Sequence, residues 1–190
     1  MNSKADNHSH HISQRFNAEL EDIKKRMLEM GGAVEQQLAD AMVSIISADS
    51  GLGSRVAQED DIIDELEVSI DEECSLIIAR RQPAASDLRL VLAIIKTVRD
   101  LERIGDESSK IARMAVKLSE EGEFPDGFVE FKHLGDRVSI MVHDSLDAFA
   151  RFDAEAALKV AQADREVDEE YASAMRSMIT YMMEDQRSIT

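Results

Sequence analysis

The predicted architecture rests on the stretch Asp87-Leu-Arg-Leu-Val-Leu-Ala-Ile-Ile-Lys-Thr-Val-Arg-Asp-Leu-Glu-Arg-Ile-Gly-Asp106. Its apolar residues recur at spacings of three and four, which indicates a helix with one buried face. The stripe continues past this stretch and comprises Val91, Ile94, Ile95, Val98, Leu101, Gly105 and Ser108. Glu102 and Asp106 lie beside the stripe one turn apart, where two like charges repel each other. Residue choices that disfavour the local structure tend to occur where function requires them. The edge of the stripe that carries Glu102 and Asp106 is therefore the first candidate site.

The composition favours long helices and an acidic surface. The 190 residues include 39 acidic and 22 basic side chains, for a formal charge of −17, and only eight glycines and two prolines. Nucleic acids and anionic membranes are bound chiefly through Lys and Arg, so we expect neither to be the primary ligand. Multivalent cations or a basic surface of a partner protein fit this charge better.

The expected compartment is the cytoplasm. Cys74 is the one cysteine, so no internal disulfide can form, and nothing after Met1 resembles a signal peptide. The sequence has no apolar run of about 20 residues, the length that would span a membrane.

Apolar periodicity and breaker residues divide the chain into five expected helices. They run from Ile12 to about residue 48, and over about 52–81, 84–118, 129–150 and 154–183. We expect residues 1–10 to form a flexible tail and residues 120–127 to form a linker.

An internal repeat appears at an offset of 104 residues. Val56-Ala-Gln-Glu-Asp60 matches Val160-Ala-Gln-Ala-Asp164, and Asp49 matches Asp153. A unit of this length corresponds to a three-helix bundle used twice. The sequence therefore predicts an all-α fold with a first repeat over 11–119 and a second over 128–190. The second repeat is expected to hold two of its three helices, whose apolar faces need a partner or stay partly exposed.

Pairs of acids at i and i+4 are the candidate metal ligands. Asp60 with Asp64 recurs in the second repeat as Asp164 with Asp168, whereas the pair Glu67 with Asp71 does not recur and ranks lower. If the second and third helices are neighbours, Asp60, Asp64, Glu102 and Asp106 would gather in one place.

Four clustered carboxylates require a cation or protonation to relieve their repulsion. Oxygen-only ligands suit hard cations such as magnesium, calcium, manganese or iron, whereas zinc sites usually include His or Cys. The alternative is a solvated acidic face beside the core.

No complete set of catalytic motifs is found. Glu-x-x-His occurs once, at Glu130-Phe-Lys-His133, whereas ferritin-type di-iron bundles use this motif on each of two helices. The sequence has no glycine-rich phosphate loop and no Ser-x-x-Lys motif, so a di-metal hydrolase is the weakest of the interpretations. A basic ribbon of Lys96, Arg99, Arg103 and Lys110 on the third helix fits a docking edge or, as the favoured interpretation, a balance of charge.

Several motifs resemble the PhoU family of bacterial phosphate-transport regulators. They are Arg80-Arg-Gln-Pro-Ala-Ala-Ser-Asp-Leu-Arg89, Asp100-Leu-Glu-Arg-Ile-Gly-Asp106, His11-Ile-Ser-Gln-Arg-Phe-Asn-Ala-Glu-Leu20, Asp144-Ser-Leu-Asp-Ala-Phe-Ala-Arg151 and Tyr181-Met-Met-Glu-Asp185. The resemblance covers nearly the whole chain.

The resemblance implies two three-helix repeats and a regulator rather than an enzyme. It implies repression of the phosphate-starvation response when phosphate is plentiful, through contacts with a phosphate ABC transporter ATPase and a histidine kinase, and a homodimer. Family members can hold multinuclear iron or another divalent metal (manganese, magnesium and zinc are also candidates) at Glu/Asp-x-x-x-Asp pairs. The matching positions here are Asp60, Asp64, Glu102, Asp106, Asp164 and Asp168. A metal-binding or metal-storage bundle is the alternative function.

Overall fold

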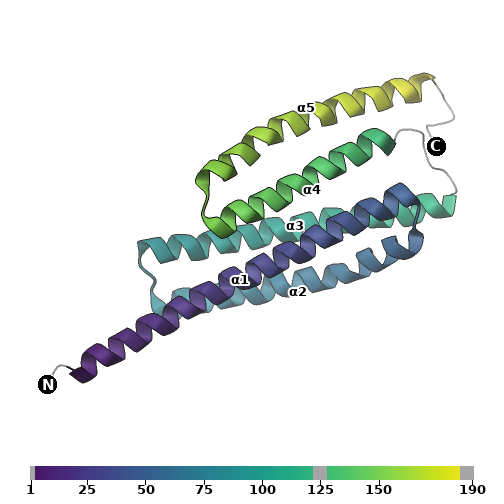
Figure 1. Ribbon diagram of the computed structural model, residues 1–190. Coiled ribbons are helices and arrows are strands. Elements are labelled where there is room, and N and C mark those ends of the chain that lie inside the picture. Colours follow the sequence, from purple (N-terminus) through teal and green to yellow (C-terminus); the bar gives the residue numbers. More distant parts are fainter. Residues whose placement is uncertain (1–2, 122–127, 185–190) are drawn as a thin grey trace. The chain divides into compact units, whose positions relative to one another are not determined.

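The computed structural model describes residues 3–121 and 128–184, and within these ranges it is built from helices without a β-strand (Figure 1). The helices are α1 (Ser3–Ser47), α2 (Ser50–Arg81), α3 (Ala85–Glu121), α4 (Phe128–Arg151) and α5 (Ala154–Glu184). The predicted all-α class and the five expected helices are confirmed.

The ends of the helices depart from the expected ones in two places. Helix α1 begins at Ser3 instead of Ile12, and α3 extends to Glu121. The polar residues before Ile12 show no apolar periodicity, so the sequence did not predict a helix there. An existing helix can nevertheless extend through them, because each added residue gains one hydrogen bond without the cost of starting a new helix. Most of the expected linker, residues 122–127, lies outside the described residues.

The chain forms two compact units, each assembled from separate stretches. One unit comprises residues 1–34 and 59–106, and the other comprises residues 35–58 and 107–190. We call them the first and the second unit. The repeats expected over 11–119 and 128–190 describe the sequence duplication, and their boundaries stay a prediction.

The first unit has one apolar core shared by three helices. The buried residues are Leu20, Ile23, Met27, Met30 and Val34 from α1, Ile63, Ile70, Cys74 and Ile77 from α2, and Val91, Ile94, Val98 and Leu101 from α3. Their spacings of three and four place each set on a single helix face, and burying one such side chain stabilises the fold by roughly 1.5–3 kcal/mol. Cys74 is fully buried, and burial raises the pKa of its thiol to about 11, so this cysteine acts as a small core residue.

Charged side chains join α1 to α2 beside this core. Arg81 Nε donates to Glu19 Oε2 at 2.9 Å, and Arg26 forms an ion pair with Glu73 and donates to Ser69 Oγ at 2.8 Å. These arginines are partly shielded from water, which strengthens their charge-assisted hydrogen bonds.

The turn between α1 and α2 recurs between α4 and α5, both within the second unit. Ala48 and Phe152 adopt positive φ of 57° and 54°, and the following residue donates back to a carbonyl of the last helical turn at 2.9 Å in both cases. Asp49 and Asp153 then cap the next helix, since their Oδ1 atoms accept the N–H of Leu52 and of Ala156, each at 2.9 Å. The same turn at the same 104-residue offset supports the predicted duplication.

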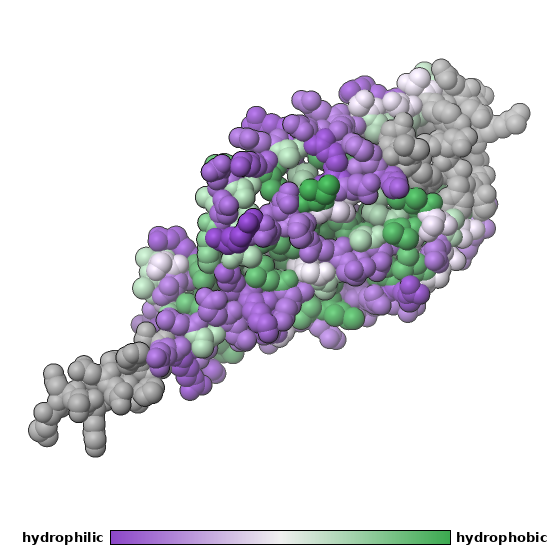
Figure 2. Space-filling model, viewed as in Figure 1, coloured by the Kyte–Doolittle hydropathy of each residue, from purple (hydrophilic) through white to green (hydrophobic). Residues whose placement is uncertain are grey.

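The visible surface is mainly hydrophilic, with hydrophobic residues dispersed between the polar ones (Figure 2). Over the described parts of the chain, no helix is both long enough and apolar enough to cross a membrane.

Substitution of Gly53 tests the close approach of α2 to α3 in the second unit. A Cβ at this position would lie 2.8 Å from the backbone oxygen of Ala112 and 3.1 Å from Val116. We expect Gly53→Ala to lower the free energy of unfolding by about 1–3 kcal/mol, because a backbone carbonyl cannot move aside as a flexible side chain can. Urea unfolding followed by circular dichroism measures this change.

Gly32 is the matched control. It lies in the interior of α1, and a Cβ there would meet no atom within 4 Å. Gly32→Ala should therefore raise the free energy of unfolding by about 0.5–1 kcal/mol, the ordinary gain of alanine over glycine in a helix. Equal stabilisation by both substitutions would contradict the assigned contact.

Candidate functional site: an acidic edge between α2 and α3

The candidate site lies in the first unit, where α2 and α3 present carboxylates toward each other. From α2 come Asp60, which is buried, and Asp64, which is exposed. From α3 come Glu102 and Asp106, both half-buried. The apolar core sets these positions, because Ile63 and Leu101 turn inward and leave their acidic neighbours at the edge of the core.

The pKa shifts show that the two helices bring these acids together. Burial raises the pKa of Asp64 above its ordinary 3.8, and the charges of Asp60 and Asp106 raise it further. Burial also raises the pKa of Glu102 above its ordinary 4.5, followed by the charges of Asp106, Glu67, Asp64 and Asp60. Every charge that contributes to these two shifts is negative, so like-charge repulsion acts on Asp64 and Glu102.

The structure thus gathers the four acids that the sequence analysis singled out, and it adds Glu67. Ranking by recurrence in the duplicated half placed Glu67 lower, yet its charge acts on Glu102. Position 67 lies seven residues after Asp60, which is two helical turns along the same face. That spacing could have identified Glu67 from the sequence. Ranking acids by their repetition in the second half of the chain selects features common to both halves, so it misses a residue that only one half uses.

The donor chemistry of this edge fits a hard divalent cation. Five carboxylates supply oxygen ligands, and a cation would relieve the repulsion that raises the pKa of Asp64 and Glu102. In the conformation seen, however, the described residues contain no group of three or more His, Cys, Asp or Glu side chains arranged to hold a metal ion. A site with three ligands therefore requires side-chain movement at the edge.

The remaining two candidate ligands belong to the other compact unit. Asp164 and Asp168 are exposed on α5 and belong to the second unit, whereas the other four candidates belong to the first. The role of all six residues as ligands stays a prediction.

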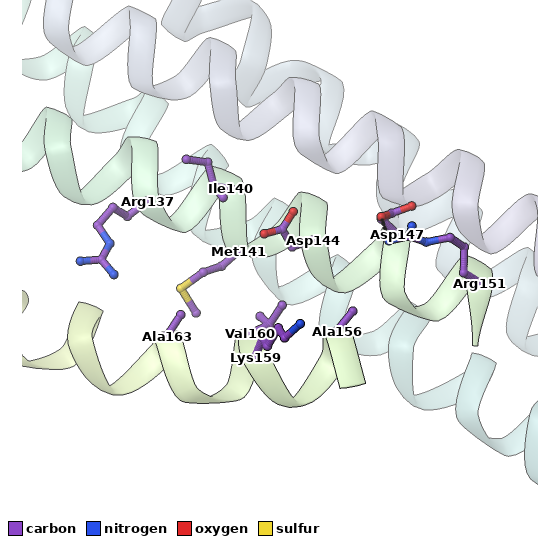
Figure 3. Close-up of a pocket in the computed structure, with 10 residues that line it drawn as sticks. All are labelled: Arg137, Ile140, Met141, Asp144, Asp147, Arg151, Ala156, Lys159, Val160 and Ala163. Carbon is purple, nitrogen blue, oxygen red and sulfur yellow. Dashed lines mark hydrogen bonds and ion pairs between the residues drawn. The ribbon is translucent and has the colours of Figure 1, made fainter. Parts of the chain in front are cut away.

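A groove between α4 and α5 is the second feature of note (Figure 3). It has a volume of about 410 Å³ and is lined by Arg137, Ile140, Met141, Asp144, Asp147 and Arg151 from α4 and by Ala156, Lys159, Val160 and Ala163 from α5. Most of its charges are engaged: Arg137 pairs with Glu166 at 2.9 Å, Arg151 pairs with Asp147, and Lys159 pairs with Glu155 at 3.1 Å.

Large apolar side chains of α4 and α5 remain exposed, as the sequence analysis anticipated for these two helices. They are Val138, Ile140, Leu158, Tyr171, Met175, Ile179 and Met183. The two histidines of α4 each lie near a glutamate: His143 Nδ1 lies 2.8 Å from Glu35 Oε1, and His133 Nδ1 lies 3.4 Å from Glu170 Oε2. Both histidine side chains are largely exposed.

The sequence of this chain is similar to those of known proteins. The family model described as "PhoU domain" matches residues 27–115 and 131–190. The "Phosphate-specific transport system accessory protein PhoU homolog" of Pseudomonas aeruginosa is 60% identical over 185 residues, which cover 97% of this chain and 76% of that protein. The "Phosphate-specific transport system accessory protein PhoU" of Escherichia coli is 49% identical over 179 residues, which cover 94% of this chain and 74% of that protein.

Solved structures agree with the sequence matches. The crystal structure of PhoU from Pseudomonas aeruginosa superposes with a TM-score of 0.89 at 60% identity, and the match covers 92% of this chain and 83% of that one. The phosphate transport system regulatory protein PhoU from Streptococcus pneumoniae gives a TM-score of 0.83 at 27% identity, covering 90% of this chain and 80% of that one.

Glu102→Gln tests the electrostatics of the acidic edge. The pKa of Glu102 is raised in the folded state, so folding favours the protonated carboxyl. The stability that this preference contributes is fully present below the ordinary pKa of 4.5, and it is lost as the pH rises through the raised pKa. We therefore expect the metal-free variant to be more stable than the parent at pH 7 by a few tenths of a kcal/mol, the scale of one like-charge contact. Below pH 4 the difference should disappear.

The measurement is urea unfolding in chelator at pH 4 and pH 7. Glu72→Gln is the matched control, because Glu72 is an exposed acid of α2 that contributes to neither raised pKa. A stability gain at pH 7 that is equal in the two variants would reflect net charge alone and would contradict the local repulsion.

Proposed function

We propose that this chain, which belongs to the PhoU family, regulates phosphate-specific transport as an accessory protein. The observation that carries the proposal is the family match over residues 27–115 and 131–190, supported by relatives named for that role at 49–60% identity. The structural agreement extends over both units, since the superposed P. aeruginosa structure covers 92% of the chain.

In its finer form, the proposal is a cytoplasmic adaptor that acts by binding rather than by catalysis. The chain would contact a phosphate ABC transporter ATPase and a phosphate-sensing histidine kinase, repress the starvation response when phosphate is plentiful, and form a homodimer. Long helices with exposed charged and apolar faces support this form, because such faces offer extended surfaces for partner helices.

Gene deletion tests the regulatory role. Cells grown in high phosphate normally keep alkaline phosphatase repressed, and we expect its activity to rise when the gene is deleted and to fall again when the gene is restored. Alkaline phosphatase activity per cell is the readout, with the vector alone as the control. Unchanged, repressed activity in the deletion strain would reject the regulatory role.

A second candidate function is metal binding at the acidic edge. It is favoured by one observation: the charges that raise the pKa of Asp64 and Glu102 all belong to neighbouring acids of α2 and α3. Asp60, Asp64, Glu102 and Asp106 would hold the ion, which would neutralise the edge and stabilise the bundle in the way that any ligand of the folded state does. Metal binding and regulation are compatible with each other.

Elemental analysis of protein purified without chelators tests this second function. We expect bound iron, manganese or another divalent metal in the parent and its loss from the variant Glu102→Gln/Asp106→Asn. The control Glu65→Gln/Glu72→Gln removes two exposed acids of α2 and should retain the metal. Metal content that survives the first double substitution would exclude the acidic edge as the site.

A further inference from the structure

The outward face of α3 carries a row of four cations and one leucine. Arg89, Leu92, Lys96, Arg99 and Arg103 follow one another at spacings of three, four, three and four, and all five are exposed. We call these five residues the basic row. At 1.5 Å per residue the row is about 21 Å long, or four helical turns.

The core holds the basic row in place. Val91, Ile94, Val98 and Leu101 are buried on the opposite face of the same helix, so α3 cannot rotate to hide its cations. All of these residues belong to the first unit, which includes the whole length of the row. The row is therefore a rigid array with fixed spacing.

The cations of the basic row form no ion pair within the part of the chain that the structure describes. In contrast, Arg26 and Arg81 of the same unit each bind a glutamate of a neighbouring helix. The sequence pattern extended this ribbon to Lys110, but Lys110 binds Glu107 at 2.8 Å and belongs to the second unit. The chain has a net charge of −17, so these unpaired cations on one helix face form a local positive patch in an acidic protein.

The acids nearest to the row along α3 form no ion pair with it. Asp100 lies four residues after Lys96 and three before Arg103, and Asp106 lies three residues after Arg103. These are spacings at which helical side chains are neighbours, yet the structure pairs none of them with the row. Asp106 takes part in the acidic edge, where its charge raises the pKa of Asp64 and Glu102.

We propose that the basic row docks an acidic, amphipathic α-helix of a partner protein. Spacings of alternating three and four are those at which one helix packs along another, with residues of the two helices in register over several turns. Leu92, with 44% of its surface exposed, supplies an apolar contact within the row. The partner helix would carry Asp or Glu at matching spacing over about four turns, with an apolar residue opposite Leu92.

The net negative charge of the chain favours this occupant over other polyanions. A membrane or a nucleic acid presents a broad negative surface, which the remaining acidic surface of the chain would repel. A single helix presents a narrow stripe that can follow the row and avoid the surrounding acids.

This inference rests on the proposed function, because the partner is sought among the proteins that such a regulator contacts. The test compares three full-length proteins: the parent, Arg99→Glu/Arg103→Glu, and the control Arg165→Glu/Arg176→Glu. The control makes the same change of charge at two exposed arginines of α5 that form no described ion pair. All substituted residues are exposed, and circular dichroism and thermal melting verify that each protein remains folded.

Binding to the purified transporter ATPase and to the cytoplasmic part of the histidine kinase is measured by calorimetry at low and high salt. We expect Arg99→Glu/Arg103→Glu to weaken binding to one of them by about tenfold or more, because reversal turns attraction into repulsion. The control should bind like the parent, and high salt should reduce parental binding. In cells, the row variant should fail to restore repression of alkaline phosphatase.

The other outcomes overturn the inference. If the parent restores repression and the row variant does so equally, with unchanged binding, the function stands and the docking role is wrong. If the parent neither binds nor restores repression, the proposed function itself fails. If reversal abolishes only self-association, or only binding to vesicles of anionic lipid, the row belongs to a second copy or to a membrane surface.

Discussion

The spacing of apolar residues along α1, α2 and α3 is the constraint on which the first unit depends. Each helix has one buried face, and the three faces close a single core. That closure determines where every other side chain points, because a helical residue cannot change its direction without rotating its whole face. Asp60 and Glu102 therefore stay at the edge between α2 and α3 although their charges repel.

The charges of the first unit are separated rather than mixed. Arginines such as Arg26 and Arg81 join helices through glutamates, the acidic edge keeps its negative potential, and the basic row faces outward. Arg103 lies one turn from Asp106 of the edge, yet the structure shows no ion pair between them. One helix consequently carries both the acids Glu102 and Asp106 and the cations of the basic row.

The duplication preserves the turn better than the acidic edge. Asp49 and Asp153 cap their helices with equal hydrogen-bond lengths at a fixed offset in the chain. Asp164 and Asp168 recur in the sequence but are exposed on α5. A turn depends on a few adjacent residues and is inherited with them, whereas a carboxylate cluster depends on two helices that are distant in sequence.

Amino-acid pattern was sufficient to identify the helices, the match between Asp49 and Asp153, and the acids that could meet on α2 and α3. Local spacing carries this information, because it sets the direction of each residue around its own helix. Packing between helices distant in sequence selected Glu67 as a fifth member of the edge, buried Asp60, and left the cations of the basic row unpaired. Those outcomes depend on which helix faces which, and periodicity within one helix does not encode its neighbour.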